Sequence, residues 1–281
     1  MLTPDEEKYV LTQAYIPEHT VGLITYLSGA EPFLVENYFC CHKAGWVVLI
    51  GYPLRNEFNR DSFEGALKEI KKRFRPRHLS LIAPELPSSL SDACRESDSD
   101  QYYTLEAKLP VLRSAINRNI RQARKVCSLE RADAMTDSHV ELMQEFTDRV
   151  KPPARVHELL KKMPGYVQQS STCVVIEASV PGKNLTAFYI VELAAQCFAN
   201  YIIGCYSKKN YVRGASDLLL YETIQLALES GKQYIHLGLG VNAGIRRFKE
   251  KWGGVPFHRY EMCELELRKP SILETILAVR K

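Results

Sequence analysis

Three strand-like runs follow one another in the middle of the chain, and they limit the fold more than any other feature of the sequence. The runs cover residues 172–179, 185–193 and 196–206. Only short breaks separate them, at Pro181-Gly182 and near Ala194-Ala195. Strands with such short connections pair as antiparallel neighbours, because a parallel pair needs a crossover of a dozen or more residues. This part of the chain is therefore predicted to form an antiparallel meander.

The elements around this meander exclude a sheet that is parallel throughout. In order, we predict a strand, two helices, the meander, a helix, a strand, a helix and a strand, at residues 129–135, 137–150, 155–163, 172–206, 216–230, 234–237, 243–252 and 257–267. A doubly wound parallel sheet would alternate strands with helices all along. The sequence instead predicts a mixed sheet, antiparallel on one side and parallel on the other. A final helix completes the order.

The first half of the chain shows a looser version of the same theme. A hairpin is predicted from residues 33–41 and 46–52, with its turn at Lys43-Ala44-Gly45. The other predicted elements are a helix that opens with Asp61 and Glu64 in capping-box spacing, a strand at 78–83, an exposed loop at 84–100 and a strand at 102–107. We expect an α/β (α+β) chain of two mixed-sheet halves with helices on both faces, divided into residues 1–128 and 129–281.

The composition is that of an ordinary folded protein. Of the 281 residues, 46% are hydrophobic and 25% are charged, which excludes a largely disordered chain. The net charge of +4 is too small to make nucleic acid the default partner, so only a local basic cluster could favour one. No apolar run approaches the ~20 residues that cross a membrane. The polar, acidic start does not resemble a signal peptide, so we expect a cytoplasmic protein.

The eight cysteines lie mostly in apolar runs and show no CxxC spacing. We interpret them as buried free thiols of a reducing compartment rather than as disulfides. Cys40-Cys41-His42 is the one cluster that resembles a metal site, but it lacks a second ligand pair at a recognisable spacing. The sequence therefore predicts no bound metal.

A long amphipathic helix is predicted from Pro110 to about residue 126. Its buried side carries Leu112, Ile116, Ile120 and Ala123, and its other side carries Arg113, Asn117, Arg121, Arg124 and Lys125. Two interpretations of this basic stripe remain open. It is either a solvated face near a domain boundary or a surface that binds a carrier's phosphates, with Arg121 and Arg124 as candidate contacts.

A glycine-rich loop leads into another short helix near the end of the chain. Its glycines, at 238, 240 and 244, have the spacing GxGxxxG, which is not the dinucleotide fingerprint. Asn242 is a good N-cap, and Ile245, Phe248, Lys249 and Trp252 share one face of the helix that follows. Lys249 stands where a hydrophobic residue is expected. It either reaches the rim of the core or is held near a carbonyl or anion whose charge it stabilises.

Residues 240–254, GVNAGIRRFKEKWGG, resemble the C-terminal signature of the FemAB-like aminoacyl transferases and the related phosphatidylglycerol lysyltransferase C-terminal domains, which are tandem GNAT folds. Residues 118–125, RNIRQARK, are similar to the basic helix that ends their first half. The resemblance covers most of the chain, strongly after residue 185 and weakly before residue 100.

This resemblance implies that an aminoacyl or acyl group moves from a carrier onto an amine, with no metal and no permanently bound cofactor. It implies that Phe248 and Lys249 lie in the active site. Lys249 would stabilise the charge that develops on the attacked carbonyl or at the leaving oxygen, and Phe248 would shape the channel. Gly240 and Asn242, in the loop before them, are candidate substrate-binding positions.

The carrier is either aminoacyl-tRNA or an acyl-coenzyme A or acyl-carrier protein. GNAT acetyltransferases bind the coenzyme's pyrophosphate at the start of a helix that here follows YVRGAS, residues 211–216. Arg213, Gly214 and Ser216 suit an anion at a helix N-terminus, but Tyr211 replaces the usual Gln or Arg and Asp217 would repel phosphate. The sequence therefore predicts a degraded coenzyme site.

The strand at 196–206 contains no Asp or Glu, where many GNAT enzymes place a general base. His236, Tyr206, water or the substrate would have to take the proton of the acceptor amine. His236 precedes the loop on a predicted strand, so a core histidine is the competing interpretation. A non-catalytic binding module of the same fold is a third alternative, and the acceptor and the oligomeric state stay open.

Overall fold

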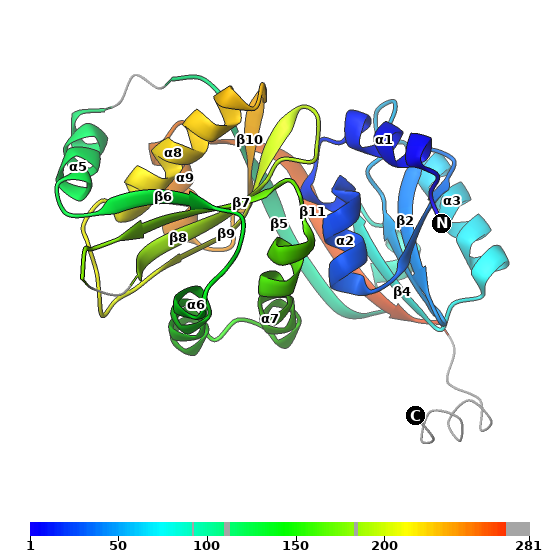
Figure 1. Cartoon of the computed structure of the whole chain (residues 1–281). Helices are drawn as coiled ribbons and strands as arrows, with labels where there is room; N and C mark the ends of the chain where they lie inside the picture. Colours follow the sequence, from blue (N-terminus) through cyan, green and yellow to red (C-terminus); the bar gives the residue numbers. More distant parts are fainter. Residues whose placement is uncertain (92, 110–112, 183–184, 268–281) are drawn as a thin grey trace. The chain divides into compact units, whose positions relative to one another are not determined.

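A computed structural model describes the whole chain except residues 92, 110–112, 183–184 and 268–281 (Figure 1). The chain divides into two compact units. Unit 1 contains Met1–Tyr102, Leu239–Ile245 and the segment from Pro256 onward, and unit 2 contains Tyr103–Gly238 and Arg246–Val255. The final helix of the sequence analysis lies outside the described residues.

The two units do not follow the sequence in order. Strand β5 (Cys94–Glu106) begins in unit 1 and ends in unit 2, and strand β11 (Val255–Glu266) returns to unit 1. There β11 pairs antiparallel with β4 (His78–Ala83), from Glu261 opposite Ala83 to Glu266 opposite His78. The expected division at residue 128 falls inside unit 2, which begins at Tyr103. A sheet can join strands that lie far apart in the sequence, as β4 and β11 do, so the units need not be continuous stretches of chain.

Unit 1 has a mixed sheet in the order β1-β2-β3-β4-β11, followed by the first part of β5. Its first three strands are β1 (Glu31–Val35), β2 (Tyr38–Lys43) and β3 (Trp46–Ile50), and its helices are α1 (Pro4–Gln13), α2 (Val21–Ser28), α3 (Arg60–Phe74), α4 (Ser88–Ser91) and the 3-10 turn η1 (Pro17–His19). Strands β1 to β3 are antiparallel, and β3 and β4 are parallel. The predicted run 33–41 is thus two strands, and α3 is capped by Asn59 rather than by Asp61.

Helices cover both faces of this sheet because alternate residues of a strand point to opposite sides. Cys40 and Leu49 pack in one cluster with Phe63 of α3. Phe39 and Ile50, their neighbours in sequence, pack in another cluster with residues of α1 and α2. The expected layering of unit 1 is confirmed.

Unit 2 has its strands in the order β10-β9-β8-β7-β6, with the second part of β5 beside β10. The strands are β6 (Ser128–Ala132), β7 (Cys173–Ser179), β8 (Leu185–Glu192), β9 (Phe198–Tyr206) and β10 (Tyr234–Leu239). Strands β6 to β9 pair antiparallel, and β9 and β10 pair parallel. The predicted meander with a parallel side is therefore confirmed.

The helices of unit 2 also lie on two faces. They are α5 (Ser114–Arg124), α6 (Asp137–Val150), α7 (Ala154–Gln169), α8 (Ala215–Glu229) and α9 (Ala243–Lys251), whose first turn belongs to unit 1. Tyr189 of β8 packs in the core with α5 and α8, whereas its neighbour Phe188 contacts His139 of α6. In Figure 1, α5 and α8 lie on one side of β6 to β9 and α6 and α7 on the other.

Two expectations about residues 84–106 are wrong. The predicted exposed loop contains α4 and the first part of β5. The sequence shows no strand pattern there, because this part of β5 is largely polar and has no buried residue before Tyr102. Hydrogen bonds hold it in place, among them one from Ser99 to Glu261 at 3.0 Å. Cys94 and Cys263 form a disulfide there, so two of the eight cysteines are not free thiols.

No described helix is long and apolar enough to cross a membrane. Within the same residues, no three His, Cys, Asp or Glu side chains gather as a metal site would require.

Candidate functional site

Helix α9 begins at the cap that the sequence predicts. The Asn242 side chain accepts hydrogen bonds from the backbone N–H groups of Gly244, at 2.9 Å, and Ile245, at 3.0 Å. The loop before it is tied down as well, because Gly240 N donates to the Gln101 carbonyl at 2.9 Å. The substrate-binding role of Gly240 and Asn242 stays a prediction.

Lys249 is buried in the core of unit 2. The residue is 4% exposed, and its ammonium nitrogen lies 5.6 Å from the centre of the Tyr103 ring. The face of an aromatic ring attracts a cation. Phe248 is half-buried against the same core, and Trp252 is 5% exposed. Ile245 is 37% exposed, so that part of the predicted inward face is wrong.

The two glycines after α9 fold the chain back onto Lys249. Gly253 has φ of +90°, a conformation that glycine adopts readily. Gly254 N donates to the Lys249 carbonyl at 2.9 Å. A Cβ on Gly254 would lie 2.8 Å from that carbonyl oxygen, so the close approach requires glycine.

Asp217 joins three helices of unit 2. Its carboxylate accepts hydrogen bonds from the Trp252 indole at 2.9 Å and from the Asn119 amide at 2.8 Å, and it pairs with the Lys251 ammonium group. Asp217 is 4% exposed in the first turn of α8. Negative charge is favourable there because of the helix dipole. The carboxylate therefore fastens α9, which carries Lys249, to α8 and α5.

The N-terminus of α8, where a coenzyme's pyrophosphate was expected, is covered by α5. Gly214 caps α8 with φ of +86°, and a Cβ there would lie 2.3 Å from the Asn119 carbonyl oxygen. Arg213 is exposed, and the Ser216 carbonyl accepts a hydrogen bond from the Tyr189 hydroxyl at 3.0 Å. The Asn119 backbone thus lies directly against the residue that caps this helix end.

We expect Gly214→Ala to separate α5 from α8. The substitution adds a methyl group against Asn119 and places alanine at positive φ, which together should cost about 2 to 3 kcal/mol of unfolding free energy. Gly231→Ala is the matched control, since Gly231 has φ of +66° at the other end of α8 with nothing within 4 Å of an added Cβ. It should cost only about 1 kcal/mol. Urea denaturation measures both, and equal losses would mean that the Asn119 contact does not matter.

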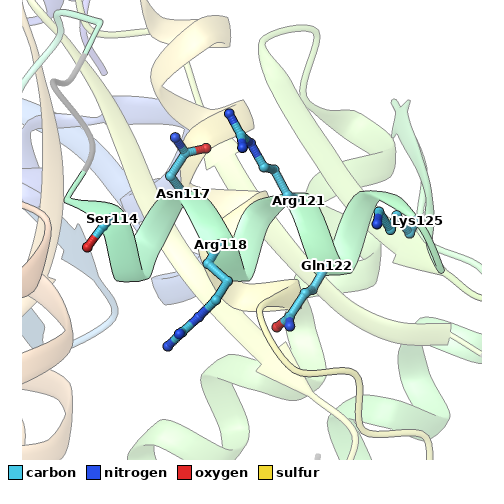
Figure 2. Close-up of a pocket in the computed structure, with 6 residues that line it drawn as sticks. All are labelled: Ser114, Asn117, Arg118, Arg121, Gln122 and Lys125. Carbon is cyan, nitrogen blue, oxygen red and sulfur yellow. The ribbon is translucent and has the colours of Figure 1, made fainter.

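The exposed face of α5 carries a basic groove of about 420 Å³ (Figure 2). Its lining residues, at helical spacing, are Ser114, Asn117, Arg118, Arg121, Gln122 and Lys125. Figure 2 shows Asn117 and Arg121 extending to one side of the helix and Arg118 and Gln122 to the other. No described acidic group pairs with the three cations. The predicted Arg124 lies elsewhere, with its guanidinium 5.1 Å from the Tyr221 ring centre, so Arg118 takes its place in the groove.

Tyr206 ends β9 and is held by α6. The Arg149 guanidinium lies 4.5 Å from its ring centre and donates two hydrogen bonds to its carbonyl, each of 3.3 Å. Glu145 accepts hydrogen bonds from Ser207 Oγ at 2.9 Å and Lys208 N at 2.6 Å. Burial raises the pKa of Glu145, but these hydrogen bonds outweigh it, so the pKa is lowered overall. The end of β9 is therefore fixed by a charged carboxylate.

His236 is fully buried on β10. Its ring contacts Phe198, with centroids 5.7 Å apart, and its Nδ1 accepts the Gly238 N–H at 3.2 Å. These contacts suit a core histidine, the competing interpretation from the sequence. A role as catalytic base stays an untested prediction.

The sequence analysis gave no structural role to three residues: Tyr103, whose ring lies against Lys249, and Asn119 and Asp217, which a hydrogen bond joins. Tyr103 lies in a strand that contains no motif. Asn119 lies in the basic segment RNIRQARK, whose pattern indicates a charged surface and not a buried hydrogen bond. Asp217 was interpreted as a repulsive group. Its position in the first turn of a helix was the one available signal, since an acidic residue there commonly has a structural role.

No family model matches the sequence, and neither does any curated protein. Solved structures do match. L-PGS from Bacillus licheniformis superposes with a TM-score of 0.59 at 15% identity, over 99% of this chain and 96% of that one. FemX superposes with a TM-score of 0.63 at 10% identity, over 93% and 96%. A tandem GNAT protein from the clavulanic acid biosynthesis pathway superposes with a TM-score of 0.54 at 11% identity, over 96% and 97%.

The fold is that of the tandem GNAT proteins. The similarity extends over almost the whole chain, so the resemblance stated from residues 240–254 is confirmed at the level of the fold.

Proposed function

We propose that this tandem GNAT chain is an acyltransferase that moves an aminoacyl group from aminoacyl-tRNA onto the amine of an acceptor. The buried Lys249 carries the proposal, because its ammonium group is held over Tyr103 in the segment that resembles the FemAB-like signature. The shared fold of FemX and L-PGS supports the same class of reaction.

In the proposed reaction the acceptor amine attacks the carbonyl carbon of the aminoacyl ester. A C–N bond forms, the ester C–O bond breaks, and the carrier's hydroxyl oxygen leaves with the proton that the amine gives up. Negative charge develops on the carbonyl oxygen and then on the leaving oxygen. A preorganised cation stabilises that charge strongly inside a core, and we assign this role to Lys249 and the shaping of the channel to Phe248.

Two features of unit 2 favour RNA over coenzyme A as the carrier. The first turn of α8 holds the Asp217 carboxylate and lies against Asn119, which leaves it poorly suited to a pyrophosphate. The groove on α5 offers three cations at helical spacing without an acidic neighbour in its lining. A row of such charges suits the phosphates of a nucleic acid.

An acyl-coenzyme A donor is the second candidate, favoured by the similarity to the clavulanic acid pathway protein. A thermal-shift measurement separates the two candidates. A ligand that binds only the native state adds ~2.7 kcal/mol of stability at ~100 times its dissociation constant. Stabilisation by an acyl-coenzyme A and not by aminoacyl-tRNA would contradict the proposed carrier.

Charge reversal in the α5 groove tests the carrier directly. Arg118→Glu combined with Arg121→Glu should weaken aminoacyl-tRNA binding at least ~10-fold and lower the slope of log Kd against log salt by ~2, since two phosphate contacts are lost. Filter binding over a range of salt concentrations measures both quantities.

The matched control makes the same change of net charge elsewhere. Lys68→Glu with Lys72→Glu alters two exposed cations on α3 of unit 1. It should leave the salt slope unchanged. If both double variants reduced binding alike, the effect would come from overall charge, and the groove would not be the RNA site.

A further inference from the structure

The end of β9 carries two aromatic side chains that the fold leaves in solvent. Tyr206 is 36% exposed and Tyr211 is 62% exposed. Their ring centroids are 6.4 Å apart, with the ring planes at 70°. Among the described residues one further aromatic side chain is exposed, Phe257 of unit 1. Exposed aromatic rings that gather at one place indicate a binding surface.

One of these rings is fixed in position before any ligand arrives. Arg149 lies over Tyr206 and binds its carbonyl, and Glu145 binds the next two residues, Ser207 and Lys208. A side chain already held in one place loses little freedom when a ligand packs against it. The exposure of Tyr206 is therefore a stable property of the fold.

The charges around the two rings are positive. Lys208, Lys209 and Arg213 are exposed, and residues 206–213 contain no acidic residue. Glu145 faces this segment, but its carboxylate already accepts hydrogen bonds from Ser207 and Lys208. A ligand that suits this surface has flat unsaturated rings and anionic groups.

We propose that Tyr206 and Tyr211 are a stacking platform for unpaired nucleobases of a single-stranded RNA, with Lys208 and Lys209 on its phosphates. Every nucleobase has a π-face, so aromatic rings beside cations bind single strands with little sequence preference. Two rings and several cations suit consecutive nucleotides better than the one adenine of coenzyme A. The inference rests on the proposed function, which supplies the RNA as the carrier's single-stranded end.

The test measures binding of a fluorescently labelled short RNA that ends in CCA, by anisotropy at several salt concentrations. Tyr211→Ala should weaken binding ~10-fold at every salt concentration, with the salt slope unchanged, because the ring carries no charge. Tyr211→Phe keeps the ring and should bind like the parent. Lys208→Gln with Lys209→Gln should lower the slope by ~1.4, at ~0.7 for each phosphate contact of a single strand.

Phe257→Ala removes the exposed ring of unit 1 and should not change binding. Tyr211 is mostly in solvent, so its alanine variant should keep the parent's Tm, which is checked alongside. Parent-like affinity of Tyr211→Ala would overturn the proposal, and so would an equal loss in Tyr211→Phe. Coenzyme A serves as a second ligand. If Tyr211→Ala weakened the binding of coenzyme A but not that of the RNA, the assignment of the platform to single-stranded RNA would be overturned.

The binding assay separates this inference from the proposed function. A protein that transfers aminoacyl groups, but whose Tyr211→Ala variant binds RNA normally, would refute the platform alone. A protein that binds RNA through the platform but transfers no aminoacyl group would refute the proposed function alone.

Discussion

Lys249→Met should lower kcat about 100-fold once the substrates are in hand, with the fold retained. Methionine fills the buried space with an apolar chain of similar length, so the core stays packed while the ammonium group is lost. The loss of one preorganised group that stabilises developing charge costs ~100-fold or more in kcat. Steady-state kinetics measures the effect, and it should appear in kcat rather than in KM, because the charge arises only in the transition state.

Arg246→Ala is the control on the same helix. Arg246 is exposed, and its removal should leave kcat within about twofold of the parent. Unchanged turnover in Lys249→Met, with the parent's Tm, would remove Lys249 from the mechanism and favour the non-catalytic binding module.

Asp217→Ala should destabilise the protein by about 3 kcal/mol. The substitution leaves the Trp252 indole N–H and the Asn119 amide without their acceptor in a buried position. The removal of one partner from a buried charged network is costly, and the partial exposure of Lys251 keeps the loss at the lower end of that range. Urea denaturation should show a lower midpoint with an unchanged m-value.

Glu229→Ala tests whether any ion-paired acid on α8 would behave in this way. Glu229 pairs with Arg131 as Asp217 pairs with Lys251, but its side chain is 58% exposed. Exposed pairs contribute little, so this variant should unfold at the parent's urea midpoint. A loss in Glu229→Ala as large as that in Asp217→Ala would mean that burial of the network is not what stabilises α9.

Helix α9 shows which features of the site local sequence patterns can predict. Helical phasing placed Lys249 on an inward face, and the structure buries it. The same phasing placed Ile245 inward and was wrong. Ile245 lies in the first turn of α9, and only the packing of neighbouring elements decides how far along the helix its apolar face is buried. Asn242 as a cap was predictable, since a cap depends on residues one to three positions away.

The long-range contacts of Lys249 and Asp217 could not be predicted in this way. Tyr103 and Lys249 are far apart in the sequence, as are Asn119, Asp217 and Trp252. No local pattern records which of many polar residues will meet. The basic helix shows the same limit: its charge was evident, but the packing of Arg124 on Tyr221 and the inclusion of Arg118 in the groove were not.

The sequence by itself determined the element order of unit 2, the antiparallel meander with its parallel side and the resemblance of residues 240–254, because periodicity, turns and motifs are local properties of the chain. Only the tertiary structure decided the return of β11 to β4, the strand and disulfide at Cys94, and the closure of the α8 N-terminus by Asn119 and Asp217. These three features depend on contacts between segments that are far apart in the sequence. Backbone hydrogen bonds and close packing join residues there whose local sequence patterns do not predict the contact.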